Sequence, residues 1–274
     1  MPILMSPMKF WQKISLPKIN KREKFILTAI LLTLGLLGIE ISGISWWCQA
    51  LALLGIVCYF LSAWSLIEGL EGIEWFTVLT LPLIFTLGIG LFNFLLLQSS
   101  LTKALTIISY GISIYILLLV GNIFSVSAIR TIQLLRSAHA VGFLFTLATS
   151  FFLYDVILSF HLPFWTNFFL VFLLSFPLII QGLWNINLEK EISPKIWLYA
   201  LSLSLVQGET VAVFSFWPVT VAAGSLVLVT TLYVTLGLAQ QDLASRLFPK
   251  TINEYLRVGI IVFLFIFFTT HWGG

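Results

Sequence analysis

Long hydrophobic runs, separated by short polar segments, occupy almost the whole chain. The runs at residues 25–43 and 75–97 are continuous and do not alternate between apolar and polar positions. A membrane β-barrel strand would alternate over about ten residues, because one of its faces meets lipid and the other a wet lumen. About twenty helical residues, at about 1.5 Å each, cross the hydrocarbon core of a bilayer and satisfy their own backbone hydrogen bonds. The pattern therefore predicts an all-α fold, a polytopic integral membrane helix bundle.

The runs predict about nine transmembrane helices in a single domain. We expect residues 1–24 to form a basic arm at the cytoplasmic face and residues 25–274 to form one transmembrane helical domain. The first run is longer than the core of a signal peptide and no small-residue cleavage site follows it, so we expect it to be retained. The candidate spans are residues 25–43, 46–67, 75–97, 105–125, 139–160, 166–186, 196–217, 219–240 and 255–271.

Basic residues indicate the direction in which the spans run. With the N-terminus in the cytoplasm, thirteen Lys and Arg residues fall on the cytoplasmic side and only Lys103 falls on the opposite side. Cytoplasmic loops of membrane proteins carry such an excess. We therefore expect the N-terminus in the cytoplasm and the C-terminus outside. In the arm, Phe10 and Trp11 lie between lysines, which favours an interfacial segment attracted to anionic lipid.

The composition excludes several classes of protein. Hydrophobic residues make up 59% of the 274 residues, charged residues make up 9%, and the formal net charge is +3. A soluble domain has about 25% charged residues, and a disordered chain combines low hydrophobicity with high charge. The basic residues are spread over short segments, so we expect no nucleic-acid partner. Cys48 and Cys58 would lie about 15 Å apart on one helix, too far for a disulfide, and we expect no metal site and no cofactor.

Ionisable residues inside the spans are the candidates for chemistry, because a charge inside a bilayer is costly and usually functional. Glu209 follows Gln207 in the most polar patch of any span, while Asp155 and Glu40 lie near the outer ends of theirs. We expect a carboxylate-lined site that opens to the outside, in which Glu209 binds a proton or a cation. The alternative is that Glu209 is protonated, or hydrogen-bonded to neighbouring helices. Lys103 is one of the few basic residues on that side.

Two charged segments lie at the cytoplasmic ends of the spans. Arg130 and Arg136 flank an apolar stripe that favours a short interfacial helix. They are candidates for contact with lipid phosphate, or else ordinary positive-inside charges. Residues 68–74 contain three acids and no base, and this loop is interpreted either as a solvated turn or as a docking or cation site.

Small residues and prolines predict how some of the helices pack. Thr86 with Gly90, and the small residues at 222–225, are typical of helices whose backbones approach closely. Pro82 and Pro177 lie inside spans and should kink them. The sequence shows no visible internal repeat.

Several short segments resemble an uncharacterised family of multi-pass membrane proteins from candidate-phylum bacteria. These segments are residues 128–136 with 139–143, residues 215–220, and residues 237–241. The family has no assigned activity, so the resemblance implies a location in the bacterial inner (cytoplasmic) membrane and transfers no functional residue.

The leading functional hypothesis is a transporter-like or permease-like protein with a carboxylate-lined intramembrane site. The alternative is a non-catalytic scaffold or accessory subunit that binds an unidentified membrane protein partner, and a membrane-embedded enzyme acting on lipid is third. No phosphate-binding loop, zinc-protease motif or nucleophile motif is present in the sequence. We therefore do not expect an enzyme.

Overall fold

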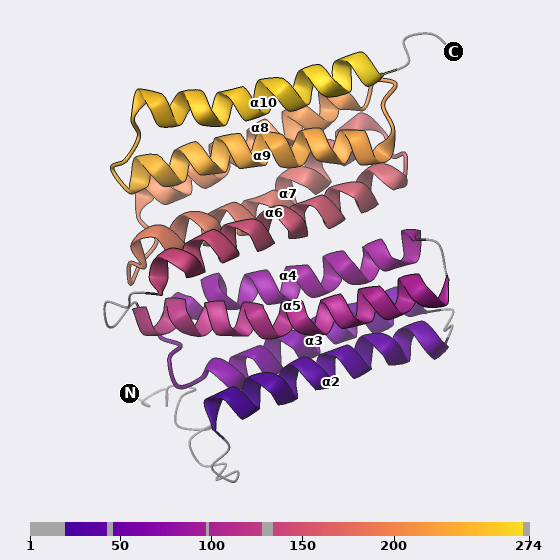
Figure 1. The fold of residues 1–274 in the computed structure, drawn as a ribbon, viewed down its shortest axis with the longest axis vertical. Coiled ribbons are helices and arrows are strands. Elements are labelled where there is room, and N and C mark those ends of the chain that lie inside the picture. The colour runs from indigo at the N-terminus through magenta and orange to yellow at the C-terminus, as the bar shows by residue number, and fades with distance from the viewer. Residues whose placement is uncertain (1–19, 43–45, 97–98, 128–133, 271–274) are drawn as a thin grey trace, which may run out of the picture.

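The chain folds into antiparallel helices (Figure 1). The computed structural model describes residues 20–42, 46–96, 99–127 and 134–270. These residues contain nine helices that are each long and apolar enough to cross a membrane. The described part of the chain thus confirms the predicted helical fold and the number of candidate spans. The helices are α2 (Lys21–Ser42), α3 (Trp47–Leu66), α4 (Glu74–Leu95), α5 (Ser100–Ser127), α6 (Leu135–Ser159), α7 (Phe164–Asn187), α8 (Pro194–Phe214), α9 (Val221–Leu243) and α10 (Pro249–Thr269).

The first eight of these helices form two successive four-helix bundles, α2–α5 and α6–α9 (Figure 1). In each bundle the first helix packs against the second and the fourth, and the third helix packs against the second and the fourth. The second and fourth helices also touch each other in both bundles. The chain therefore repeats a packing arrangement, although its sequence shows no visible repeat.

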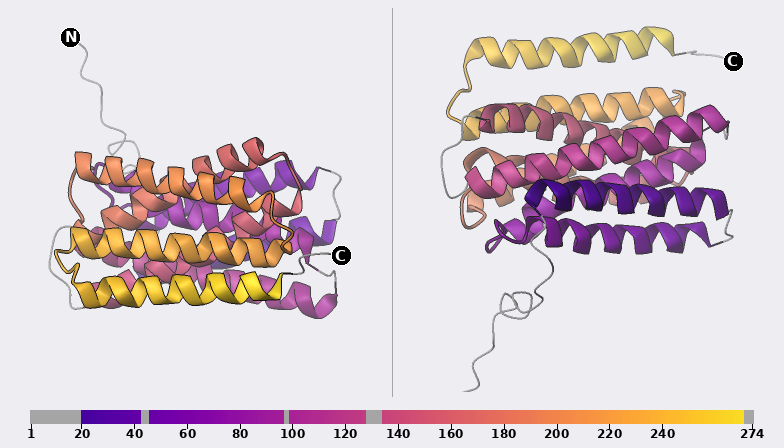
Figure 2. Two further views of the ribbon diagram at one scale, coloured as in Figure 1. Left: turned by 90° about the horizontal axis from the view of Figure 1, so that it is seen from above. Right: turned by 60° about the horizontal axis from the view of Figure 1, so that its bottom comes forward.

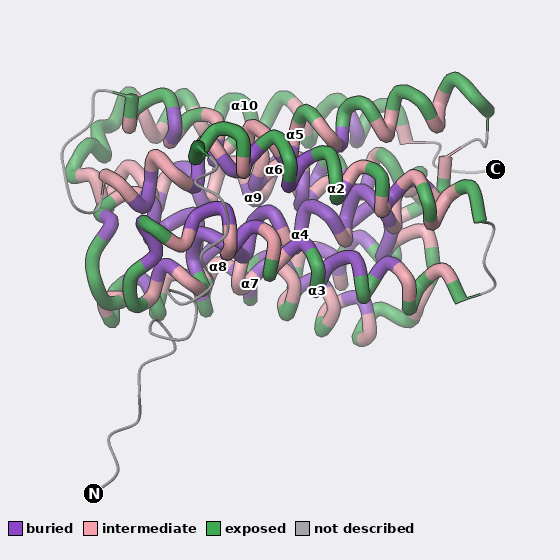
Figure 3. The backbone as a smooth tube through the Cα atoms, turned by 90° about the horizontal axis from the view of Figure 1, so that it is seen from below, coloured by how far each residue is buried: buried purple, intermediate pink, exposed green. Residues whose placement is uncertain are grey.

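Helix α4 joins the two bundles, whereas α10 lies at the edge of the molecule. Besides its neighbours in the first bundle, α4 packs against α6 and α7, and it is the most buried of the described helices (Figure 3). Helix α10 packs mainly against α9 (Figure 2). Ile266 is the buried residue of α10, so most of this helix faces the surroundings of the protein.

The close helix contacts that the small residues predict are present. A Cβ added at Gly90 would overlap the side chain of Leu51 on α3, and one added at Gly224 would lie 3.0 Å from Leu158 Cδ1 on α6. These positions therefore allow α4 to approach α3 and α9 to approach α6. Pro82 lies inside α4, where its carbonyl accepts a hydrogen bond of 2.8 Å from Thr86 Oγ1.

The acidic loop that follows α3 is fastened to α2. Lys21 Nζ and Lys24 Nζ each lie 3.0 Å from a carboxylate oxygen of Glu68. Their hydrogen bonds hold the pKa of Glu68 below its ordinary value. Further along the same pair of helices, Thr28 and Ser65 share a buried hydrogen bond of 2.6 Å. At least one acid of this loop thus serves a contact within the chain.

Candidate functional site

Gln207 and Glu209, the two polar residues of α8 that we expected to act together, point in different directions. Gln207 is buried, and in the orientation that satisfies its whole amide it donates to Leu228 O at 3.1 Å and accepts from Leu232 N at 3.0 Å. Glu209 is exposed, on a surface where Leu205 and Val213 are 43% and 62% exposed. Residues two apart on a helix point about 200° from each other, so Gln207 packs against α9 while Glu209 faces outward.

Glu40 belongs to the first bundle, on α2. Its side chain is 4% exposed, and Lys103 Nζ on α5 lies 3.9 Å from Oε1. That distance exceeds a hydrogen bond, and both carboxylate oxygens are buried without a hydrogen-bond partner. Lys103 is therefore the basic neighbour of Glu40, as its position in the sequence suggested.

The three carboxylates of the expected site lie on three different helices. Glu40 lies in the first bundle, whereas Asp155 and Glu209 lie in the second, on α6 and α8 (Figure 1). Asp155 is buried and Glu209 is exposed. The physical reason is the rotation of each helix about its own axis, since a helix that packs on its neighbours with one face turns its other face away.

Asp155 is the carboxylate that lies inside the second bundle. Ser225 Oγ on α9 donates to Asp155 Oδ1 at 3.2 Å. Leu158 lies about one helical turn after Asp155 on α6, and Gly224 directly precedes Ser225 on α9. Both residues line a pocket of about 260 Å³. We call this cavity the Asn167 pocket. Asp155 therefore lies just beneath a cavity at one end of the bundle.

Polar groups from several elements line the Asn167 pocket. Asn167 itself is 3% exposed, and its Nδ2 donates to Leu162 O at 3.2 Å and to Ser215 Oγ at 3.3 Å. Its Oδ1 is buried without a hydrogen-bond partner. His161, which adopts a left-handed backbone conformation with φ 48°, also lines the cavity. The pocket thus offers donors and a buried acceptor near Asp155.

A line of hydrogen-bonded side chains, the polar seam, joins α6 and α7 within the same bundle. At the Asp155 end, Tyr154 shares a hydrogen bond of 2.7 Å with Ser175. Ser150 Oγ donates to the backbone carbonyl of Thr146 at 2.9 Å. The members of the seam are Thr146, Ser150, Tyr154, Ser175, Gln181 and Asn185, all of them buried.

The polar seam continues to the opposite end of the bundle. Gln181 Nε2 donates to Thr146 Oγ1 at 2.7 Å, and Asn185 Nδ2 donates to Gln181 Oε1 at 3.2 Å. The ring of His139 stacks on Phe124 with ring centroids 5.6 Å apart. Asn185 Oδ1 and His139 Nε2 are buried without hydrogen-bond partners.

A second cavity, the Arg136 pocket, lies at this opposite end. It has a volume of about 550 Å³, and Arg136, His139, Gln240, Arg246 and Tyr255 are among its lining residues. Asn185, the last member of the polar seam, directly precedes Ile186 and Asn187, which also line this cavity. Of the two arginines that the sequence proposed as phosphate contacts, Arg136 lines the cavity, and Arg130 lies outside the described residues.

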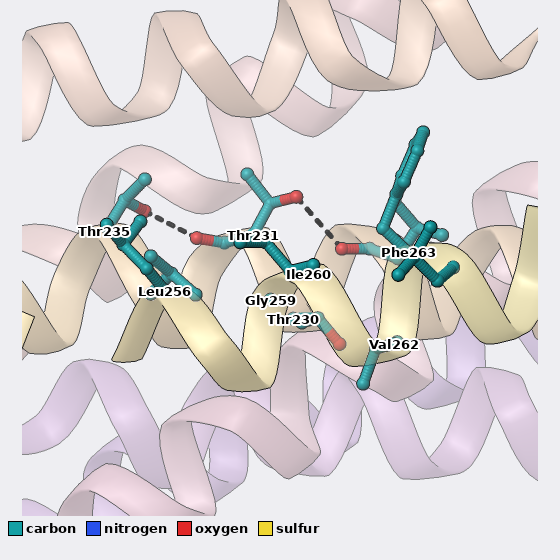
Figure 4. A pocket seen from close by; sticks show the side chains of 11 residues that line it. Thr230, Thr231, Thr235, Leu256, Gly259, Ile260, Val262 and Phe263 are labelled. Carbon is teal, nitrogen blue, oxygen red and sulfur yellow. Dashed lines mark hydrogen bonds between the residues drawn. The ribbon is translucent and has the colours of Figure 1, made fainter. Parts of the chain in front are cut away.

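An apolar groove between α9 and α10 has a different character (Figure 4). Its volume is about 330 Å³. Thr231 and Thr235 line it, but their hydroxyls donate to Val227 O at 3.0 Å and to Thr231 O at 2.8 Å within α9. These threonines therefore offer no free donor to a ligand. Among the described residues, no group of three His, Cys, Asp or Glu side chains is arranged to hold a metal ion.

The polar seam was missed in the reading of the sequence, although a signal for it exists. Thr146, Ser150 and Tyr154 recur every four residues in one span, and Gln181 and Asn185 do so in the next. A spacing of four residues keeps side chains on the same face of a helix. The sequence alone does not show that these two faces meet.

One comparison with known proteins gives a match. A family model described as "Protein of unknown function (DUF5656)" matches residues 63–269, a range that includes both pockets and the whole polar seam but neither Glu40 nor the basic arm. No curated protein matches the chain, and no solved structure does. The match fits the uncharacterised family that the sequence was found to resemble.

Proposed function

The chain belongs to the DUF5656 family of proteins of unknown function, and we propose that it is a transporter-like membrane protein. In this proposal, the second bundle moves a proton or a small cation past Asp155. The observation that carries this proposal is the position of Asp155, a buried carboxylate beneath the Asn167 pocket. The nine apolar helices fit a multi-pass membrane protein. We propose that it lies in a bacterial inner membrane with its N-terminus in the cytoplasm and anionic lipid at its basic arm.

A buried carboxylate suits ion handling for an energetic reason. On insertion scales an ionised residue at the centre of a membrane helix costs about 2.5–3.5 kcal/mol, and Asp155, which lies four residues before the end of α6 at Ser159, carries part of this cost. Ser225 compensates for part of this cost with one hydrogen bond to Asp155. A proton or a cation that arrives through the Asn167 pocket would neutralise the remaining charge, so occupancy of the site is coupled to helix packing around Asp155.

The polar seam supplies a continuation toward the other end of the bundle. Its hydroxyl and amide groups both donate and accept hydrogen bonds, as relays of protons or ordered water require. Apolar residues, among them Val171 and Leu228, pack around Tyr154 and close the bundle between the two pockets. Transport therefore requires a rearrangement that exposes Asp155 alternately to each pocket.

Ion flux in reconstituted vesicles tests the proposal. The full-length protein is placed in liposomes that contain a pH-sensitive dye, with potassium and valinomycin to clamp the membrane potential, and a pH step or a sodium gradient is applied. We expect the wild type to relax the gradient faster than protein-free liposomes and Asp155→Asn to relax it no faster than they do. Glu209→Gln is the matched control, because Glu209 faces away from the bundle, and it should keep the wild-type rate.

Two outcomes would overturn the proposal. One is a wild-type protein that carries neither protons nor sodium. The other is a folded Asp155→Asn variant with the wild-type rate. Thermal unfolding of each variant in detergent shows that it is folded.

The outward faces of α8 and α10 favour a second candidate function, that of an accessory subunit. Glu209 is a carboxylate on an exposed apolar surface, and α10 exposes large side chains such as Ile261 and Phe265. A partner helix would cover both features. A photoreactive residue at position 261 in cells that express the protein tests this candidate, since it should yield a discrete protein adduct if the partner exists and only lipid adducts otherwise. No described feature favours the lipid-acting enzyme.

A further inference from the structure

The Arg136 pocket is built by parts of the chain that lie far apart in sequence. Arg136 comes from the first turn of α6, Arg246 from the segment between α9 and α10, and Tyr255 from α10. Residues from the last turns of α7 and α9 complete the wall. Four helices and the segment between α9 and α10 thus converge on one cavity of about 550 Å³ at the end of the bundle.

Among the described residues that line this cavity, the permanently charged side chains are those of Arg136 and Arg246. Neither Arg136 nor Arg246 takes part in an ion pair with another described residue, and no acidic residue is among the described residues of the lining. Asp242, near the end of α9, is already engaged by Lys195 Nζ at 2.6 Å and by the Tyr199 hydroxyl at 2.8 Å. The two guanidinium groups therefore lack a counter-charge within the described part of the chain.

The remainder of the wall is polar and aromatic. His139 presents a buried Nε2 without a hydrogen-bond partner. Gln240 is fixed by a hydrogen bond of 2.9 Å from its Nε2 to Gly182 O. The ring of Tyr255 lies so close to α9 that a Cβ at position 237 would overlap it, and Gly237 makes this close contact possible. The fixed contacts of Gln240 and Tyr255 hold this part of the wall in place.

We propose that the Arg136 pocket binds the phosphate group of an anionic ligand, with a membrane lipid headgroup as its source. A guanidinium group is a planar fork of donors that matches phosphate oxygens, so two arginines that converge without acids are well suited to this group. The amino end of α6 adds the positive end of its helix dipole. Basic pockets between membrane helices on the cytoplasmic side bind anionic headgroups. The inference is independent of the proposed ion pathway, because it concerns binding and not transport.

Competition for a fluorescent phosphatidylglycerol tests this inference on the full-length protein in detergent. Fluorescence anisotropy reports binding, and the competitors are unlabelled phosphatidylglycerol, diacylglycerol and inorganic phosphate. The test variant is Arg136→Gln with Arg246→Gln. The matched control is Lys250→Gln with Arg257→Gln, which removes the same charge from residues outside the lining. We expect affinity to fall about tenfold or more in the test variant, because both guanidinium donors to the phosphate are lost, and to stay within about twofold in the control.

The competitors identify the source of the phosphate. Displacement by phosphatidylglycerol but not by inorganic phosphate supports a lipid headgroup, and displacement by both supports the same chemistry with a soluble ligand. Diacylglycerol lacks phosphate and should not compete. Equal binding by the wild type and the test variant, or equal competition by diacylglycerol and phosphatidylglycerol, would overturn the inference. Arg136→Lys with Arg246→Lys keeps the charge but removes the forks, so it should fold normally and bind with intermediate affinity.

Discussion

Replacement of Glu209 by leucine should make the isolated protein more stable. The side chain lies on an exposed apolar surface of α8, five residues before the helix ends at Phe214, which places it about 7–8 Å from that end. An acidic residue at the centre of a membrane helix costs about 2.5–3.5 kcal/mol, and leucine there gains about 0.5 kcal/mol. Because the cost falls toward the membrane surface, we expect Glu209→Leu to raise the free energy of unfolding by about 1–2 kcal/mol.

Reversible unfolding by dodecyl sulfate in lipid bicelles measures this change. Asp155→Leu is the matched comparison on α6, and it should lower the free energy of unfolding because it leaves the Ser225 hydroxyl without its carboxylate partner. A Glu209→Leu variant that is less stable than the wild type would refute the reasoning, since it would show that the carboxylate makes a favourable contact within the folded protein. Unchanged stability would mean that the Glu209 side chain reaches water.

Three further predictions concern stability. Gly90→Ala should lower the free energy of unfolding by about 1–3 kcal/mol, because the added methyl group overlaps a side chain of a neighbouring helix. Gly38→Ala, which has nothing within 4 Å, should leave the free energy of unfolding unchanged or raise it by up to about 1 kcal/mol. Thermal unfolding of the two variants checks the sign of each change. Tyr154→Phe removes a buried hydrogen bond of 2.7 Å and should cost about 0.5–1.5 kcal/mol in the same assay, and an unchanged melting temperature would show that the bond is not formed. Because the pKa of Glu68 is lowered in the folded protein, its ion pairs stabilise the fold above the ordinary pKa of a glutamate, and this stability is lost as the pH falls through the lower folded-state pKa. Glu68→Gln should therefore remove part of the loss of stability on acidification, about 0.2–1 kcal/mol for such an exposed ion pair. Thermal unfolding of the wild type and the variant at several pH values checks this difference.

The helices themselves could be predicted from sequence, because length and hydropathy decide whether a segment can cross a bilayer. The predicted span 166–186 corresponds to α7, and the span 25–43 to α2. Close approach at Gly90 was also predictable, since only small residues allow it. The arrangement of the helices in two four-helix bundles was not. Nearly every face of these helices is apolar, so hydrophobic patterning does not show which face is covered by protein and which by lipid.

The candidate site depends on that missing information. Glu209 was the most polar signal in its span, but the side on which α8 meets α9 places Gln207 inside and Glu209 outside. Asp155 was predicted as a member of the site, and its partner Ser225 lies 70 residues later in the chain. A contact between residues so distant in sequence depends on which helices become neighbours in the fold. The identity of a single residue does not show this.

The position of α4 has a consequence for the synthesis of the protein. This helix contacts α6 and α7 of the second bundle as well as its own neighbours, yet it leaves the ribosome before either of them. With elongation at about 5–20 residues per second, the face of α4 that will receive them stays uncovered by α6 and α7 for a time on the order of seconds. The contact surface of α4 is therefore synthesised before α6 and α7, which will cover it. The second half of the chain can then assemble on a first half that is already in place.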